Sequence, residues 1–367
     1  MNKAAGQADD IAMKGGGYYS LATIGAKHVI DAATPLVLEA VAAMDLAEAD
    51  VFTMSDMGCA DGGTSIDMVA EVLRRVREAH PGISLAIVYS DQPRNDYNAL
   101  FQIVHGLTEI ESQLPAIEGL HVMASATSFY RQIVPSKTLN LGFSATAMHW
   151  LSAKPGDIST HVQAVGAEGD ELARFAEQGR RDWETILLNR AAELVPGGRL
   201  VFANFCRDEA GRYLGNTSGI SMFDTFRDVW LAFVEEGTID HDEYVAMTLP
   251  QYYRDVGEFV QPLQDPASPV HGAGLRLERI ETRVTRCPFA ADFERHGDAA
   301  VFAKAYIPTL RSWTESTFFA ALDRARPAEE RQAIIDGFYD NYEARVREAP
   351  AGHGMDYVHA FMTIAKV

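Results

Sequence analysis

The amino-acid sequence predicts an α/β fold with a Rossmann-like, mostly parallel sheet and an inserted helical cap. Residues 51–57 form a short apolar strand that runs into a glycine-rich turn, residues 65–79 have helical spacing, and residues 84–89 form a second buried-type strand. Strand, turn, helix and strand in this order make a βαβ unit, which joins parallel strands. Such sheets are covered by helices on both faces.

The remaining elements follow in chain order. A helix is expected to start at Thr34–Pro35, because proline is tolerated in a first helical turn and an amphipathic pattern follows it. Further strands are expected at 120–124, 139–143, 199–205, 275–284 and 357–365. Two helical, aromatic-rich segments, approximately 208–270 and 297–350, are expected to form the cap of a single domain spanning 1–367.

Composition limits the classes of function. The 367 residues are 47% hydrophobic and 23% charged, as in an ordinary globular enzyme. The net charge of −19 argues against a nucleic-acid partner, since phosphate binding needs a basic surface. Three scattered cysteines and no HExxH spacing give no reason to expect a disulfide framework or a metal. No signal-peptide core and no membrane-length apolar run are visible, so a cytoplasmic protein is expected.

The turn after the first strand, Asp56-Met57-Gly58-Cys59-Ala60-Asp61-Gly62-Gly63, stands where an open α/β sheet binds its ligand. It lacks the second glycine of GxGxxG and the lysine of a P-loop. An acidic loop is a poor phosphate site but suits a cation such as S-adenosylmethionine, which carries an ammonium and a sulfonium. Asp91, at the end of the second strand, could accept the ribose hydroxyls of an adenosine. The alternative is that these acidic residues form turns or lie in solvent and bind no ligand.

Several further segments follow in a recognisable order. They are Met13 to Gly17 with Tyr19, Asp56 to Gly62, Ser90 to Asn98, Ser128 to Tyr130, Ser144 to Ser152, Glu193 to Leu200 and Leu249 to Tyr252. Together they span nearly the whole chain, which resembles the SABATH carboxyl methyltransferases. Members methylate salicylate, benzoate, indoleacetate, jasmonate or gibberellins, and some relatives are N-methyltransferases. The resemblance implies a class I methyltransferase sheet, S-adenosyl-L-methionine as cofactor and a homodimer. Departures from the plant pattern favour a bacterial member.

The family pattern assigns roles to individual residues. For the cofactor it implies Lys14, Tyr19, Asp56, Gly58, Asp61, Asp91, Gln92, Ser128, Phe129 and Ser144. Among them, Asp91 looks like the ribose ligand, and Phe129 looks like part of the adenine wall. Trp150 matches the indole whose N–H donates to the substrate carboxylate, with His149 beside it. The positions similar to the pocket wall are Ala26, Thr146, Met222, Phe223, Tyr252, Leu310, Trp313 and Tyr357.

Three pocket positions depart from the family. Ala26 stands where the family has a glutamine, Thr146 where it has a tyrosine, and Phe223 where it has a tryptophan. These losses of bulk and polarity favour a roomier, more aliphatic pocket. Medium-chain fatty acids are therefore expected slightly ahead of aromatic acids.

The expected chemistry needs no general base, because a carboxyl group with a pKa near about 4 is ionised at neutral pH. Transfer of a methyl group to this carboxylate needs positioning and a donor or two, which fits the lack of a Ser-His-Asp or metal constellation. We therefore expect an enzyme that converts a small apolar acid to its methyl ester. The alternatives are an N-methyltransferase of a heteroaromatic compound and an inactive cofactor-binding protein, and a packed core aromatic is the plain alternative for Trp150.

Overall fold

The computed structural model describes Ser20 and residues 23–367, in which an eight-stranded sheet has the order β3-β2-β1-β4-β5-β8-β7, with β6 paired to β5 off this path. The strands are β1 (Val51–Met57), β2 (Ser84–Asp91), β3 (Leu120–Ala126), β4 (Leu139–Ala145), β5 (Leu194–Arg207), β6 (Arg254–Asp255), β7 (Leu275–Thr285) and β8 (Tyr357–Lys366). Strands β1 to β5 are parallel, whereas β8 is antiparallel to both of its neighbours. The predicted α/β fold with a Rossmann-like sheet is confirmed.

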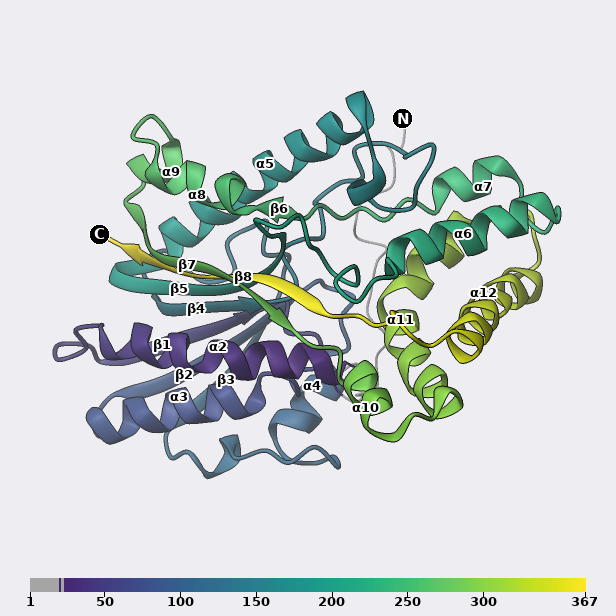
Figure 1. The fold of residues 1–367 in the computed structure, drawn as a ribbon. Coiled ribbons are helices and arrows are strands. Elements are labelled where there is room, and N and C mark those ends of the chain that lie inside the picture. Colours follow the sequence, from purple (N-terminus) through teal and green to yellow (C-terminus); the bar gives the residue numbers. More distant parts are fainter. Residues whose placement is uncertain (1–19, 21–22) are drawn as a thin grey trace.

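Helices cover both faces of the sheet and one of its ends (Figure 1). The helices are α2 (Ile24–Ala42), α3 (Ile66–Ala79), α4 (Tyr97–Val104), α5 (Gly169–Glu193), α6 (Met222–Glu235), α7 (His241–Ala246), α8 (Val256–Gln264), α9 (Pro269–Gly272), α10 (Pro288–His296), α11 (Ala299–Ala321) and α12 (Ala328–Glu348). On one face lie α2 and α3, and on the other lie α5, α8 and α9. Strand β5 is buried on both sides, as a central parallel strand requires.

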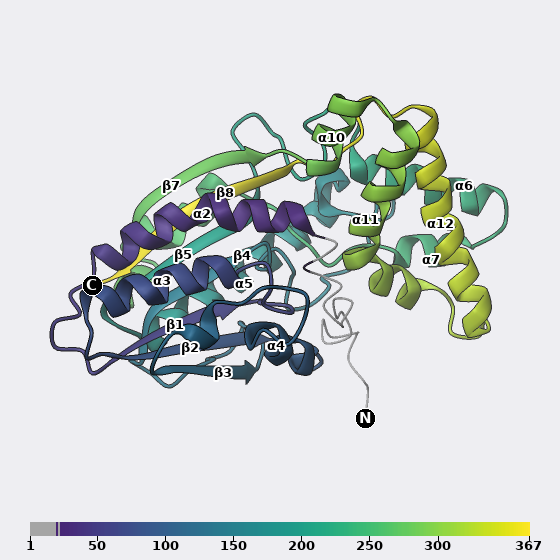
Figure 2. The ribbon, with the colours of Figure 1, turned by 90° about the horizontal axis from the view of Figure 1, so that it is seen from below.

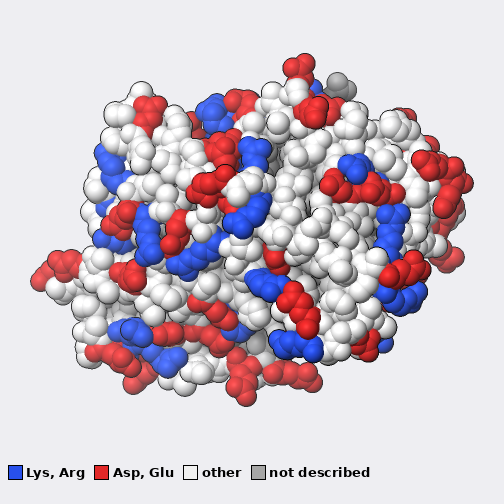
Figure 3. Space-filling model, viewed as in Figure 1, with Lys and Arg blue, Asp and Glu red and all other residues white. Residues whose placement is uncertain are grey.

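The cap consists of α6, α7, α10, α11 and α12, which lie together beyond the end of the sheet (Figure 2). The segment 256–272, which the spacing assigned to the cap, instead packs as α8 and α9 beside α5 and β7. The reason is burial, because Phe259 and Leu263 share an apolar cluster with Trp183 of α5. On the face drawn in Figure 3, Lys and Arg are interleaved with Asp and Glu, as on a solvated surface.

The predicted starts of one helix and one strand differ from the structure by several residues. Helix α2 begins at Ile24, well before the expected start, and passes through Pro35. Proline removes one backbone hydrogen bond there, but buried Ala26 and Val29 before it and Val37 after it keep both halves against the core. Strand β5 starts at Leu194, before the expected start at residue 199, and the added residues lie at an irregularity in its pairing with β4.

Candidate active site

The glycine loop after β1 leads directly into the region between the sheet and the cap. Gly58 has a φ of +76°, and a Cβ atom there would lie 2.4 Å from the Cβ of Ala147. Glycine is therefore required both by the left-handed backbone and by the close approach. The contact brings this loop against the loop after β4, which carries His149 and Trp150.

Two carboxylates, those of buried Asp56 and half-buried Asp91, lie at the ends of the adjacent strands β1 and β2. Asp91 accepts hydrogen bonds from the backbone N–H groups of Ala60 at 2.8 Å and Gln92 at 2.7 Å, while Asp56 accepts one from the Ser65 hydroxyl at 2.5 Å. Burial raises the pKa of both acids, and that of Asp56 reaches about 7, with the charge of Asp91 adding to the effect. Among the described residues neither carboxylate is paired with a cation, so this cradle would be stabilised by a positively charged ligand.

The other expected cofactor residues surround this cradle. Asp61 accepts from the N–H of Ser20 at 3.1 Å and so ties the segment before α2 to the loop. The Ser144 hydroxyl donates to the carbonyl of Met57 at 2.7 Å and holds the end of β1 against β4. The Phe129 ring lies 3.9 Å from the Cβ position of Gly58.

Three further residues of that set complete the description. The side-chain oxygen of Gln92 is buried with no hydrogen-bond partner in the described part of the chain. The Ser128 hydroxyl accepts from the N–H of Tyr130 at 3.4 Å, in the same loop as Phe129. Lys14 and Tyr19 lie outside the described residues.

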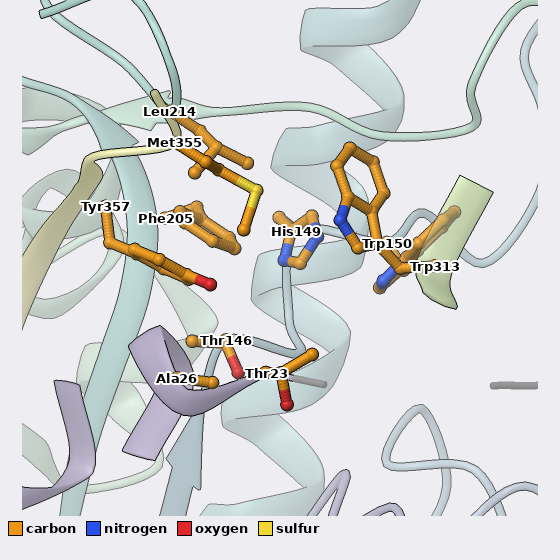
Figure 4. Close-up of a pocket in the computed structure, with 10 residues that line it drawn as sticks. All are labelled: Thr23, Ala26, Thr146, His149, Trp150, Phe205, Leu214, Trp313, Met355 and Tyr357. Atoms are coloured by element: carbon orange, nitrogen blue, oxygen red, sulfur yellow. The ribbon is translucent and has the colours of Figure 1, made fainter. Parts of the chain in front are cut away.

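A cavity of about 410 Å³, including the space at its mouth, lies between residues of β5 and β8 and Trp313 of the cap helix α11 (Figure 4). Its lining comes from the start of α2, the loop after β4, β5, α11 and the approach to β8. The lining residues are Thr23, Ala26, Thr146, His149, Trp150, Phe205, Leu214, Trp313, Met355 and Tyr357. The cavity therefore brings together six of the residues expected around the acid: Ala26, Thr146, His149, Trp150, Trp313 and Tyr357.

His149 and Trp150 lie side by side, with ring centroids 5.5 Å apart. Burial lowers the pKa of His149 well below its usual range, helped by nearby His359 and Arg254, so its imidazole is neutral. Its Nδ1 is buried without a hydrogen-bond partner among the described residues. Thr146 has a φ of +56°, which a β-branched residue rarely adopts, so the backbone is strained at the cavity wall.

The chain is similar to known proteins over nearly its whole length. A family model for "SAM dependent carboxyl methyltransferase" matches residues 9–367. The chain belongs to this family, the SABATH carboxyl methyltransferases. Its methyl donor is therefore S-adenosylmethionine, and the acidic cradle around Asp56 and Asp91 fits this cation with its ribose.

Individual relatives support the assignment to the carboxyl methyltransferases. Indole-3-acetate O-methyltransferase 1 of Oryza sativa subsp. japonica is 26% identical over 281 residues, which cover 70% of this chain and 68% of the relative. Gibberellic acid methyltransferase 2 of Arabidopsis thaliana is 28% identical, over 56% of this chain and 57% of the relative. A solved loganic acid methyltransferase with SAH shares the fold, with a TM-score of 0.73 and 20% identity, over 96% of this chain and 98% of that one. Both sequence relatives are plant proteins, so they give no support to the expectation of a bacterial member.

Four expected pocket residues of this carboxyl methyltransferase lie outside the cavity lining. The Tyr252 hydroxyl donates to Glu258 at 2.7 Å, and its ring packs with Leu151 and Phe175 away from the cavity. Its neighbour Tyr253 is the one whose ring lies near His149, at 5.7 Å. The other three are buried in the main core cluster, behind the lining: Met222, Phe223 and Leu310. The Phe223 ring contacts that of Trp313, which does line the cavity, with ring centroids 6.3 Å apart.

Sequence reasoning missed four lining residues, Thr23, Phe205, Leu214 and Met355. Leu214 and Met355 come from loops with no motif, so no local signal marks them. Phe205 could have been found, because it ends the predicted strand 199–205 at the edge where ligands bind.

Two structure-wide findings complete the description. Within the described residues no helix is both long and apolar enough to cross a bilayer. In the same part of the chain no three His, Cys, Asp or Glu side chains are arranged to hold a metal ion.

Proposed function

We propose that this carboxyl methyltransferase esterifies a small, largely apolar carboxylic acid, giving its methyl ester and S-adenosylhomocysteine. The observation that carries the proposal is the cavity, which has apolar walls with neutral polar groups and is lined by the loop after β4, the same loop that approaches Gly58 through Ala147. Its aromatic and aliphatic side chains, among them Phe205, Leu214 and Trp313, suit an apolar acid tail. The indole of Trp150 is a donor-only group on a rigid ring, suited to a carboxylate oxygen.

When bound, S-adenosylmethionine supplies an electrophilic methyl group on a sulfonium. The acid is already ionised, so the residues around it need not remove a proton. Trp150 holds one carboxylate oxygen, and neutral His149 closes the wall beside it without adding a charge. In this arrangement the protein contributes orientation, which can be worth about 7–11 kcal/mol at most, and exclusion of water by the cap.

The lining favours two subclasses of acid for different reasons. Ala26 and Thr146, both in the wall, leave space where the family has larger residues and so favour a flexible medium-chain fatty acid. The rings of Trp150, Trp313 and Tyr357 favour a flat aromatic acid. Because Phe223 lies behind the wall, it adds nothing to the argument for an aliphatic acid.

A panel of acids with a labelled methyl donor tests the proposal. Octanoate, benzoate, salicylate and indole-3-acetate cover both subclasses, with caffeine-type heteroaromatics as N-methylation substrates. Labelled methyl ester from at least one acid is the expected result. Label transfer only to a ring nitrogen, or to none of the compounds, would contradict it.

The donor role has its own test. Trp150→Phe keeps an aromatic ring but removes the N–H, and a hydrogen bond to a charged group is worth about 1.5–3 kcal/mol. We expect kcat/KM for the accepted acid to fall by roughly tenfold or more, while S-adenosylhomocysteine binding changes little. Trp230→Phe in the cap core is the matched control and should retain activity. Equal losses in the two variants would assign Trp150 to packing alone.

A cytoplasmic location and a homodimeric assembly are also part of this proposal. Light scattering of the purified protein tests the second, and a monomer at micromolar concentration would contradict it.

A further inference from the structure

Tyr130 links the loop expected to hold adenine to the loop that carries Trp150. It follows Phe129 in the chain, and the two rings lie 4.8 Å apart. Its hydroxyl donates a hydrogen bond to the backbone carbonyl of Trp150. One side chain therefore connects the loop of Phe129 with the loop of Trp150.

Helix α5 fixes the first of these loops. Its fully buried Arg190 donates to the carbonyl of Phe129 at 3.0 Å and to that of Arg131 at 2.7 Å. Glu193 pairs with Arg190 at 2.6 Å and accepts from the N–H of Ile133 at 2.5 Å. The loop is thus held by its backbone on either side of Tyr130.

The second loop is held by the same helix, at residues that precede Arg190 in the chain. Asp182 accepts from the N–H and hydroxyl of Ser152 at 2.8 and 2.6 Å. Arg254 donates to the carbonyl of Met148 at 3.0 Å and to that of Gly179 on α5. Both flanks of the His149–Trp150 pair are fixed, and between these flanks the Tyr130 hydroxyl contacts the carbonyl of Trp150.

We propose that Tyr130 is a positioning residue that couples binding of the methyl donor to binding of the acid. The inference rests on the proposed function. Because the backbone of this loop is already held, a ligand packed against Phe129 restricts the Phe129 and Tyr130 rings, and this restriction reaches the Trp150 backbone through the phenol. Because the backbone sets the direction of the indole N–H, the first ligand prepares the donor for the carboxylate. By linkage, the acid strengthens donor binding by the same factor.

The experiment measures this factor by calorimetry. S-adenosylhomocysteine is titrated with and without the acid, and the acid with and without S-adenosylhomocysteine, using indole-3-acetate and octanoate as probes. In the wild type we expect each ligand to tighten the other severalfold. Tyr130→Phe keeps the ring contact with Phe129 and should lower the coupling factor by about threefold or more, since one hydrogen bond is lost. The affinity for S-adenosylhomocysteine alone should stay within about twofold of the wild type, because Tyr130→Phe leaves the Phe129 wall in place.

Tyr339→Phe is the matched control, because it also removes a buried phenol hydrogen bond, in this case with Thr314 at 2.7 Å in the cap. It should keep the full coupling factor. Asn189→Ala is a second variant, since Asn189 donates to the Tyr130 carbonyl at 3.0 Å, and it should lower the coupling without touching the phenol.

The outcomes separate the two proposals. Unchanged coupling in Tyr130→Phe, or a loss confined to S-adenosylhomocysteine binding alone, overturns the role of Tyr130 while leaving the proposed function intact. A wild type that methylates none of the acids overturns the proposed function, and the coupling proposal with it.

Discussion

Replacing Asp91 by asparagine tests the cofactor end of the site. The two carboxylate oxygens of Asp91 accept from the N–H groups of Ala60 and Gln92, at 2.8 and 2.7 Å. Asparagine has the same size but only one acceptor oxygen, so one of these backbone groups loses its partner, which costs about 1–3 kcal/mol. The neutral side chain also recovers some stability, because burial disfavours the wild-type carboxylate and raises its pKa.

Those two effects act in opposite directions on the stability of the folded protein. The substitution also weakens cofactor binding, because the ribose hydroxyls lose a charged acceptor. A hydroxyl bonded to a carboxylate is worth about 1.5–3 kcal/mol, and about 1.4 kcal/mol corresponds to tenfold in affinity. The affinity of Asp91→Asn for S-adenosylmethionine should therefore fall by roughly tenfold or more, measured by calorimetry on the folded variant. Asp96→Asn is the control, because the Asp96 side chain caps α4 by accepting from the N–H of Ala99 at 3.0 Å, and this variant should bind normally. Normal binding by both variants would remove Asp91 from the site.

The remaining predictions concern pH and the cavity wall. Because the folded pKa of Asp56 is raised to about 7, the free folded protein retains a proton that the unfolded chain releases, so this group lowers stability as pH rises from about 4 to 7. Denaturant titrations of Asp56→Asn between about pH 4 and 7 should show a flatter decline in the free energy of unfolding. An unaltered slope would show that Asp56 does not cause the decline. At saturating S-adenosylmethionine, kcat/KM for the acid should stay flat from about pH 6 to 8, because the acid is ionised and burial keeps His149 neutral. A steep loss below about pH 7 that disappears in His149→Gln would instead favour N-methylation. Thr146→Gly should raise stability by about 1 kcal/mol by relieving the left-handed backbone at φ +56°, and a lower Tm would contradict this. Thr146→Tyr should penalise octanoate relative to benzoate by about 1–3 kcal/mol through overpacking, so an unchanged ratio of kcat/KM values would place residue 146 away from the acid's tail.

Much of the sheet could be predicted because its information is local. Strand β1 has the predicted bounds, and β2 ends at Asp91, slightly beyond the predicted end at residue 89. The predictions are this close because alternation and glycine turns mark strand ends within a few residues. The partners of α8 could not be predicted in this way. Helical spacing shows that a helix has an apolar face, but the packing of Phe259 on Trp183 is a long-range fact, with ring centroids 5.2 Å apart.

The candidate site also contains residues that local sequence predicts and residues that it does not. Asp56 and Asp91 could be predicted as site residues because the topology fixes where strand ends meet, whereas Thr146 is predicted from resemblance to the family. Tyr252 was expected in the pocket on resemblance, but in the segment after Pro250 it is Tyr253 that turns toward His149. A shift of one residue reverses the direction of a side chain in extended backbone, which a motif alone does not resolve.

The distribution of charge explains how one site can hold a carboxylate and a sulfonium close together. At the proposed cofactor end, buried Asp56 and half-buried Asp91 have no cation partner among the described residues, so a positively charged ligand would stabilise them. At the acid end, the described lining contains no lysine or arginine, and His149 is neutral. A lysine here would bind the carboxylate more tightly, yet it would stabilise the ground state that must lose its charge during transfer. Neutral donors avoid that cost, and the strongest partner left for the carboxylate is the sulfonium itself.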